Sequence, residues 1–200
     1  MGCGPVWEAI NFAAMDQYTQ LWEEGYKGGL PIIFNFFNNQ YGMGGQTMGE
    51  TMGYNMLARV GAGVNPDQLH AERVDGYNPL AVIDATRRKK ELIESGKAPV
   101  LLDVVTYRLT GHSPSDAGSY RTKEEVDMWT AEDCVQSFGK KLIEAGIASA
   151  EIIKAVNAAV KERMTRLCGY AADYEISPRF AVNGLDNLMF SNQRIEKMEI

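Results

Sequence analysis

The sequence predicts an α/β fold with a doubly wound, mostly parallel sheet, followed by a helical extension toward the C-terminus. Residues 31–37 and 100–107 are apolar on both alternations, which is typical of parallel strands covered on both faces. Segments with apolar residues at helical spacing alternate with these strands, as in doubly wound sheets. After about residue 122 the pattern indicates helices alone. We therefore expect an α/β domain over residues 1–120, a helical extension over 121–168 and a tail or linker over 169–200.

Each element follows from a local signal. The first helix is expected to begin at Pro5, because proline suits the first helical position, and its apolar spacing continues to about Glu24. Asn78 is predicted to cap a later helix that ends at Ser95. The remaining expectations, in chain order, are a central strand over residues 31–37, a short helix over 51–60, a loop over 61–66, a short strand over 71–74, a strand over 100–107, a loop over 110–120 and a clear helix from Ser149.

Composition and charge exclude several classes of protein. With 45% hydrophobic and 23% charged residues, the chain is globular rather than disordered. A net charge of −6 argues against a nucleic-acid surface, and the basic run at residues 87–90 is predicted to be a solvated helical face. No apolar stretch is long enough for a membrane span, and no signal peptide is visible. Three scattered cysteines fit reduced thiols in a cytoplasmic setting, without a disulfide framework or a zinc site.

Polar residues directly follow the first predicted strand, in the run Asn38-Asn39-Gln40-Tyr41-Gly42-Met43-Gly44. Ligands of open α/β sheets bind beyond the carboxyl ends of the strands, where this run lies. Magnesium prefers oxygen ligands and often takes only one or two of them from protein. The side chain of Asn39 and the main-chain carbonyl of Tyr41 could supply two. Asn and Gly are also ordinary turn formers, so a plain turn is the alternative.

A second polar loop follows the other buried strand and contains Arg108, His112 and several hydroxyl groups. In a parallel sheet both strands end at the same edge, so we expect the two loops to face one crevice. A histidine, an arginine and hydroxyls there could hold a diphosphate or assist proton transfer. A surface loop is the alternative. The other histidine, His70, is predicted to be structural or exposed.

The chain opens on a glycine turn, Gly2-Cys3-Gly4-Pro5, that leads into the first helix. Main-chain N–H groups at a helix start form an anion site, so Gly4 is a candidate for phosphate binding. Ordinary helix capping explains this short pattern equally well. The sequence contains no P-loop, no Rossmann fingerprint and no nucleophile elbow.

Taken together, these motifs resemble a known family, the alpha subunits of the thiamine-diphosphate-dependent 2-oxoacid dehydrogenases. That family contains the decarboxylating first components of the pyruvate, branched-chain and acetoin dehydrogenase complexes. The resemblance covers roughly residues 2–165. The matching segments are residues 4–13, Leu30-Pro31, residues 38–44, Arg73-Val74-Asp75-Gly76, residues 96–100 and the long stretch from Thr106 to Glu125.

The resemblance implies a sheet of the thiamine-diphosphate-binding type and a role for each matching residue. Asn39 and the Tyr41 carbonyl are expected to ligate magnesium, with Gly4 and Gly42 also at the cofactor. His112 is expected to lie over the cofactor in the active-site cleft, as a diphosphate contact or proton carrier. Ser113 stands where some relatives are inactivated by phosphorylation.

The resemblance also implies that part of the site lies elsewhere. The family's Gly-Asp-Gly motif, whose aspartate binds the metal, would fall before Met1, so we expect an N-terminally truncated domain. The family's catalytic glutamate comes from a beta-type partner subunit or region, and the acyl group passes to a lipoyl-bearing acyltransferase. The isolated chain is therefore expected to bind thiamine diphosphate and magnesium poorly and to have no turnover.

Two alternatives from other classes remain open at this point. The first is a non-catalytic, degenerate assembly subunit that keeps the fold and a partner surface. The second is an unrelated flavodoxin-like cofactor binder. Binding of thiamine diphosphate with magnesium, or of flavin, would distinguish these alternatives from the enzyme component.

Overall fold

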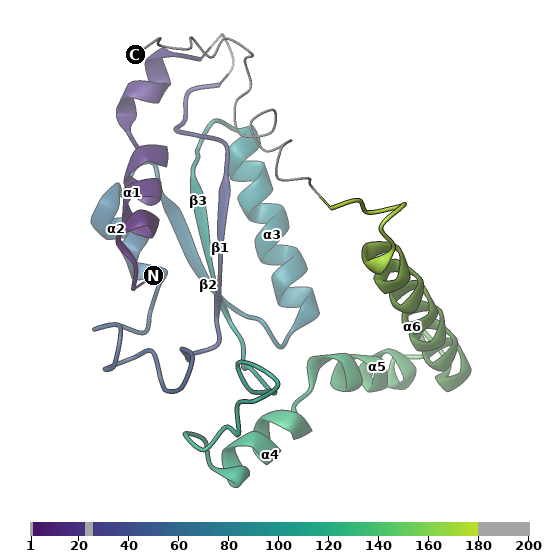
Figure 1. Cartoon of the computed structure of the whole chain (residues 1–200). Coiled ribbons are helices and arrows are strands. Elements are labelled where there is room, and N and C mark those ends of the chain that lie inside the picture. Colours follow the sequence, from purple (N-terminus) through teal and green to yellow (C-terminus); the bar gives the residue numbers. More distant parts are fainter. Residues whose placement is uncertain (1, 23–25, 180–200) are drawn as a thin grey trace, which may run out of the picture. The chain divides into compact units, whose positions relative to one another are not determined.

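The computed structural model describes residues 2–22 and 26–179, and it contains a three-stranded parallel sheet at its centre (Figure 1). The strands are β1 (Ile33–Asn38), β2 (His70–Asp75) and β3 (Val100–Val105), in the spatial order β1-β3-β2. Both neighbours of β3 run parallel to it. The predicted α/β fold with a parallel sheet is therefore confirmed.

Helices cover both faces of this sheet, as Figure 1 shows, with α1 and α2 on one side and α3 on the other. The helices are α1 (Gly4–Ala13), the 3₁₀-helix η1 (Asp16–Gln20), α2 (Arg59–Val64), α3 (Pro79–Glu94), α4 (Lys123–Ala131), α5 (Cys134–Glu144) and α6 (Ala150–Ala172). Asn78 caps α3 as predicted, because its Oδ1 accepts from the Ala81 N–H at 3.3 Å.

The core consists of two apolar layers that share β3. On one face, Leu101 packs with Ile10 of α1 and Val60 of α2. On the other face, Leu102 packs with Ala85 of α3. Successive residues of a strand point to opposite faces, so one central strand supplies both layers.

The first strand is an edge strand, which corrects the prediction of a central one. β1 pairs only with β3 among the described residues, and its side chains are mostly half-buried or exposed. Phe37 is 73% exposed. The residues of β3, in contrast, are buried almost throughout. The two strands have similar apolar patterns in the sequence, and both were therefore predicted to be buried. In the structure only β3 has a neighbouring strand on each side among the described residues.

Two predicted helix boundaries were wrong, and a hydrogen bond from a distant residue accounts for the first of them. α1 ends at Ala13 rather than near Glu24, because the Leu30 N–H bonds the Ala13 carbonyl at 3.0 Å. The predicted helix over residues 51–60 begins only at Arg59 and continues to Val64 within the predicted loop. Residues 23–25, which the longer first helix would include, lie outside the described residues.

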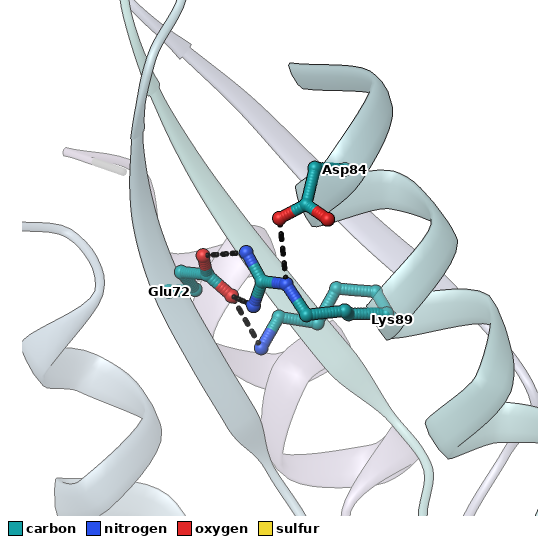
Figure 2. A network of polar contacts seen from close by, with 4 residues as sticks. Glu72, Asp84 and Lys89 are labelled. Carbon is teal, nitrogen blue, oxygen red and sulfur yellow. Dashed lines mark hydrogen bonds and ion pairs between the residues drawn. The ribbon is translucent and has the colours of Figure 1, made fainter. Parts of the chain in front are cut away.

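An ion-pair network joins β2 to α3, the helix that packs on this strand (Figure 2). The guanidinium of Arg88 donates two bonds of 2.6 Å to the carboxylate of Glu72 and one of 2.9 Å to Asp84. The ammonium of Lys89, a buried residue, lies 3.1 Å from the same Glu72 carboxylate. Hydrogen bonds from Arg88, the largest cause, lower the pKa of Glu72.

The chain divides into two compact units, residues 1–141 and 142–200. The first unit holds the sheet, α1 to α4 and most of α5. The second holds the end of α5 and the long helix α6, which begins at the Ser149 cap as predicted. The predicted tail overlaps α6 as far as Ala172, and residues 180–200 lie outside the described residues. No helix in the described part of the chain combines the length and apolar character needed to cross a bilayer.

Candidate functional site

The polar loops leave the sheet at one edge, as the sequence analysis expected. Asn38 at the end of β1 and Asp75 at the end of β2 both lie beside Val105 at the end of β3. The segments that follow all three strands therefore start at the same edge. Gly76 follows β2 there, and a Cβ on it would lie 2.6 Å from the Val105 carbonyl, so only glycine fits.

The two neighbouring asparagines have different roles. Asn38 is buried, and its amide group donates to the carboxylate of Asp103 and to the carbonyl of Asn55, both at 3.0 Å. Asn39 is the half-buried residue that follows, and its Oδ1 accepts from the Tyr41 N–H at 3.0 Å. Asn38 is thus fixed by the core, while Asn39 holds the turn after the strand.

Tyr41 belongs to a short hairpin that leaves its carbonyl outside the hairpin ladder. Tyr41 forms an antiparallel bridge with Gln46, held by bonds from the Thr47 N–H to the Gln40 carbonyl and from the Gly42 N–H to the Gly45 carbonyl, both 2.8 Å. In such a pair, the bridging residues do not bond each other across the ladder. The Tyr41 N–H donates to Asn39, and no main-chain donor among the described residues bonds the Tyr41 carbonyl oxygen.

These two oxygens fit a magnesium ion in number and chemistry. The Asn39 amide oxygen has a second lone pair beyond the one that Tyr41 uses, and the Tyr41 carbonyl is a neutral oxygen donor close to it in sequence. No group of three or more His, Cys, Asp or Glu residues suitable for a metal occurs among the described residues. The described residues therefore supply neutral donors at this point rather than a full set of charged ligands.

A hollow of about 190 Å³ lies beside this turn and is lined by Asn39, Tyr41 and Met52, among others. Met52 also lies near the N-terminal glycine turn, 3.8 Å from where a Cβ of Gly2 would be. Gly2, two residues before the exposed Gly4 that begins α1, thus lies next to a residue that lines the hollow beside Asn39. Cys3, the residue before α1, makes no side-chain cap bond.

The second polar loop is tied to the first by an arginine. Arg108 donates from Nη1 to the Gly42 carbonyl at 2.8 Å and from Nη2 to the Tyr120 hydroxyl at 2.5 Å. Both main-chain groups of Gly42 are therefore engaged within the protein. The sequence analysis considered Arg108 as a diphosphate contact, and the structure uses its guanidinium to join the loops.

His112 lies on the second loop and is exposed. The main-chain N–H of His112 donates to the carboxylate of Asp116 at 2.7 Å. With Thr110 and Ser113, among others, His112 lines a hollow of about 500 Å³. This hollow shares no lining residue with the hollow beside Asn39. The structure thus brings Asn39, Tyr41 and Gly42 together, and places His112 on a loop connected to them through Arg108.

Sequence reasoning missed an aromatic cluster between the loops. The rings of Tyr41 and Tyr107 meet edge to face at 5.7 Å, and Trp129 stacks on Tyr107 at 5.0 Å. The Arg121 guanidinium lies 5.6 Å from the Tyr41 ring centroid. Glu125 of α4 accepts hydrogen bonds from both tyrosines. The run of aromatic and charged residues from Tyr107 to Trp129 was the available signal, but only the fold shows which of them meet.

His70 lies at the opposite end of the sheet from the site. It begins β2, beside Val100 at the start of β3. Burial, and then the nearby charges of Lys89 and Lys97, lower its pKa. Its position is consistent with the predicted structural role.

Fold and loops together define an α/β protein whose oxygen donors lie at the carboxyl edge of a parallel sheet, where such folds bind cofactors. The sequence profile of the Dehydrogenase E1 component family matches residues 2–178. The chain belongs to this family, which confirms the resemblance drawn from its motifs.

Relatives in several organisms carry the name of one subunit. The chain is 37% identical over 152 residues to the pyruvate dehydrogenase E1 component subunit alpha of Zymomonas mobilis, a match that covers 76% of this chain and 38% of the relative. It is 33% identical over 170 residues to the human somatic mitochondrial form, covering 84% and 39%. It is 32% identical over 177 residues to a probable mitochondrial form of Caenorhabditis elegans, covering 88% and 40%. The chain thus spans about two fifths of the length of these relatives.

Proposed function

We propose that this chain is the alpha-type region of a thiamine-diphosphate-dependent 2-oxoacid dehydrogenase. Such an enzyme decarboxylates a 2-oxoacid and transfers the acyl group to a lipoyl group. The observation that carries the proposal is the Asn39–Tyr41 turn, which offers two oxygen donors at the carboxyl edge of the sheet in a chain of this family. The names of the relatives favour pyruvate among the 2-oxoacids. Family membership disfavours the flavodoxin-like alternative.

In this proposal Asn39 and the Tyr41 carbonyl hold magnesium, and the ion carries the diphosphate of the cofactor. The start of α1 at Gly4 would add its N-terminal dipole toward the same diphosphate. Gly42 shapes the turn through its bonds to Gly45 and Arg108. The cofactor, when bound, supplies the carbanion chemistry, and the protein binds it, orients it and excludes water.

The proposed role of His112 is to contact the diphosphate or to carry a proton at its imidazole. It stands on a loop that is exposed in the chain alone and is anchored at Asp116 and, through Arg108, at Gly42. An imidazole has one nitrogen that can donate a proton and one that can accept a proton, which suits proton transfer. Ser113 and Ser115 follow it with their hydroxyl oxygens 3.1 Å apart.

The proposal includes the partners that the family resemblance implies. A beta-type subunit or region supplies the catalytic glutamate, and a lipoyl-bearing acyltransferase accepts the acyl group. A cytoplasmic location is part of the proposal, and the names of the relatives include mitochondrial forms. We expect the chain alone to bind magnesium and thiamine diphosphate weakly and to show no turnover, because its described donors to the ion are neutral.

Calorimetry with thiamine diphosphate and increasing magnesium tests the proposal. Asn39→Ala removes one of two donors, so we expect magnesium-dependent binding to weaken about tenfold, or about 1.4 kcal/mol. Asn157→Ala is the matched control, because Asn157 is an exposed asparagine of α6, and it should bind as the unmodified chain does.

Equal binding by the Asn39→Ala variant and the unmodified chain would contradict the metal role of Asn39. If the unmodified chain shows no magnesium-dependent binding at millimolar concentrations, alone or with its beta-type partner, the degenerate assembly subunit replaces the enzyme component as the better proposal.

A further inference from the structure

Glu125 connects the two polar loops of the site. Its Oε1 accepts a hydrogen bond from the Tyr41 hydroxyl and another, 3.0 Å long, from the Tyr107 hydroxyl. Tyr41 lies in the hairpin after β1, and Tyr107 follows β3, so a single carboxylate on α4 binds both loops. Tyr41 is 8% exposed and Tyr107 is 9% exposed. Bonds to a charged acceptor that are shielded from water in this way are stronger than exposed ones.

The start of α4 shows that this use of the carboxylate is not the usual one. Thr122 caps the helix, and its Oγ1 accepts from the Glu125 N–H at 3.2 Å. A glutamate at this third helical position commonly returns to the N–H of the capping residue and completes a capping box. Here its Oε1 instead points to the two tyrosines. The capping bond from the Glu125 N–H to Thr122 is thus present, while the Glu125 carboxylate binds the tyrosine hydroxyls.

The bond from the Tyr41 hydroxyl to Glu125 affects the peptide unit between Tyr41 and Gly42, which contains the Tyr41 carbonyl. The Tyr41 N–H is bound to Asn39, the Gly42 N–H to Gly45, and the Gly42 carbonyl to Arg108. The main chain is therefore held on either side of the Tyr41 carbonyl. Two side-chain bonds tie this hairpin to other segments, one from Arg108 to the Gly42 carbonyl and one from the Tyr41 hydroxyl to Glu125, and both oppose a rotation of the hairpin about the end of β1.

We propose that Glu125 is a positioning residue for the metal site: it anchors the Tyr41 side chain and so fixes the direction of the Tyr41 carbonyl. This inference rests on the proposed function in one respect, namely that the carbonyl ligates magnesium. Magnesium demands near-ideal octahedral geometry, so a small rotation of one carbonyl ligand weakens binding. Glu125 itself does not touch the ion.

A purely structural role at the helix start is the competing explanation, and the chain offers a matched control. Glu124 precedes Glu125 in the same first turn of α4 and is exposed. Both carboxylates interact favourably with the positive end of the helix. Replacing either one removes that interaction, whereas only Glu125→Ala releases Tyr41 and Tyr107.

The experiment measures the hairpin and the metal separately. Hydrogen exchange of the Gly42 and Thr47 amides, which form the hairpin bonds, reports the hairpin without any ligand. Calorimetry with thiamine diphosphate and increasing magnesium reports the ion. We expect Glu125→Ala to speed exchange of both amides and to weaken magnesium binding, each about tenfold. Glu124→Ala should change neither, and Glu125→Gln should restore most of both because its amide oxygen still accepts from the hydroxyls.

A double-mutant cycle tests whether Glu125 acts through the Tyr41 hydroxyl. Tyr41→Phe removes the hydroxyl and keeps the main-chain carbonyl. We expect it to reproduce the Glu125→Ala effect on exchange, and the double variant to be no worse than either single one. Additive effects, or equal effects from Glu124→Ala and Glu125→Ala, would overturn the positioning role.

The two proposals fail in different ways. If no form of the chain binds magnesium with thiamine diphosphate, alone or with its beta-type partner, the proposed function fails, and hydrogen exchange alone then decides whether Glu125 fixes the hairpin. If the unmodified chain binds and Glu125→Ala binds equally well while folded, the proposed function stands and the positioning role is wrong.

Discussion

At the scale of single residues, Asp116 organises the loop that carries His112. Its Oδ2 accepts from the main-chain N–H of His112 and from the Tyr120 hydroxyl, both at 2.7 Å. Its Oδ1 accepts from the main-chain N–H of Gly118 at 2.8 Å. Three donors on one carboxylate stabilise its charged form. These bonds, the one from the His112 N–H first, lower the pKa of Asp116 to about 2. A single ionised side chain thus closes the turn that presents the histidine.

Replacing Tyr120 by Phe should raise the pKa of Asp116, because it removes one of the three donors. Carboxyl ¹³C shifts followed by NMR during an acid titration measure this change. Tyr170→Phe, at a tyrosine 45% exposed on α6, is the matched control and should leave the titration unchanged. A titration of Asp116 near 3.8 in the unmodified chain would contradict the hydrogen-bonded loop.

The same pKa fixes how the loop responds to pH. The pKa of Asp116 is depressed in the folded state, so its contribution to stability is present above the unfolded value of 3.8 and is lost as the pH falls toward about 2. The hydrogen bonds of Asp116 should therefore hold the His112 loop at neutral pH and should be lost between about pH 4 and pH 2.

At the scale of secondary-structure elements, the contact between β2 and α3 includes a lysine that is difficult to bury. Lys89 is 6% exposed, and the carboxylate of Glu72 compensates the charge of its ammonium. The same carboxylate accepts two hydrogen bonds from the guanidinium of Arg88 (Figure 2). Removing one partner of a buried ion pair leaves a charge without compensation, which costs more than the pair contributes. The packing of α3 on the sheet therefore depends on Glu72.

We expect Glu72→Gln to lower the free energy of unfolding by about 2 kcal/mol, less than for a fully buried pair because the Glu72 side chain is 25% exposed. Adding Lys89→Met removes the stranded ammonium and should recover most of that loss. Urea denaturation measures both. Glu94→Gln, which affects only the exposed pair with Lys90, should stay within about 0.5 kcal/mol of the unmodified chain. A double variant as unstable as Glu72→Gln alone would show that the lysine charge is not the cause.

The elements also show which parts of the fold local sequence determines. α3 and α6 were predicted closely, because Asn78 and Ser149 cap them within the segment itself. The end of α1 was predicted wrongly, because it depends on two distant donors. The Leu30 N–H bonds the Ala13 carbonyl, and the Asn65 side chain bonds the Ala14 carbonyl. Partners so far along the chain leave no local pattern.

The candidate site divides in the same way. The polar run from Asn38 and the loop containing His112 were predictable, because each follows a strand and carries residues typical of cofactor sites. That Asn38 is a core residue and Asn39 the outward one depends on Asp103, 65 residues away from Asn38. The role of Glu125 depends on a tyrosine 84 residues away. Such pairings follow from the strand order β1-β3-β2, which local sequence does not contain.

At the scale of the whole α/β unit, Asp103 joins the sheet to the segments that surround the site. It is fully buried in the central strand β3. Its carboxylate accepts from the Asn38 amide at 3.0 Å, from the Leu57 N–H at 2.9 Å and from the Ala58 N–H at 3.3 Å. The last two bonds satisfy the main chain just before α2, which explains why that helix begins at Arg59 rather than earlier. One carboxylate thus sets the end of β1 and the start of α2.

Asp103→Ala should therefore destabilise the unit by about 3 kcal/mol, because it removes the acceptor of the Leu57 and Ala58 N–H groups and of one of the two N–H groups of the buried Asn38 amide. Urea denaturation measures the loss, and hydrogen exchange of the Leu57 and Ala58 amides should accelerate in the folded variant. Asp103→Asn keeps one acceptor oxygen and should lose less. Asp84→Ala is the control at an exposed aspartate, with an expected change within about 1 kcal/mol. A loss below about 1 kcal/mol for Asp103→Ala, with unchanged exchange at both amides, would mean that the segment before α2 is held by other contacts and that Asp103 does not join it to the sheet.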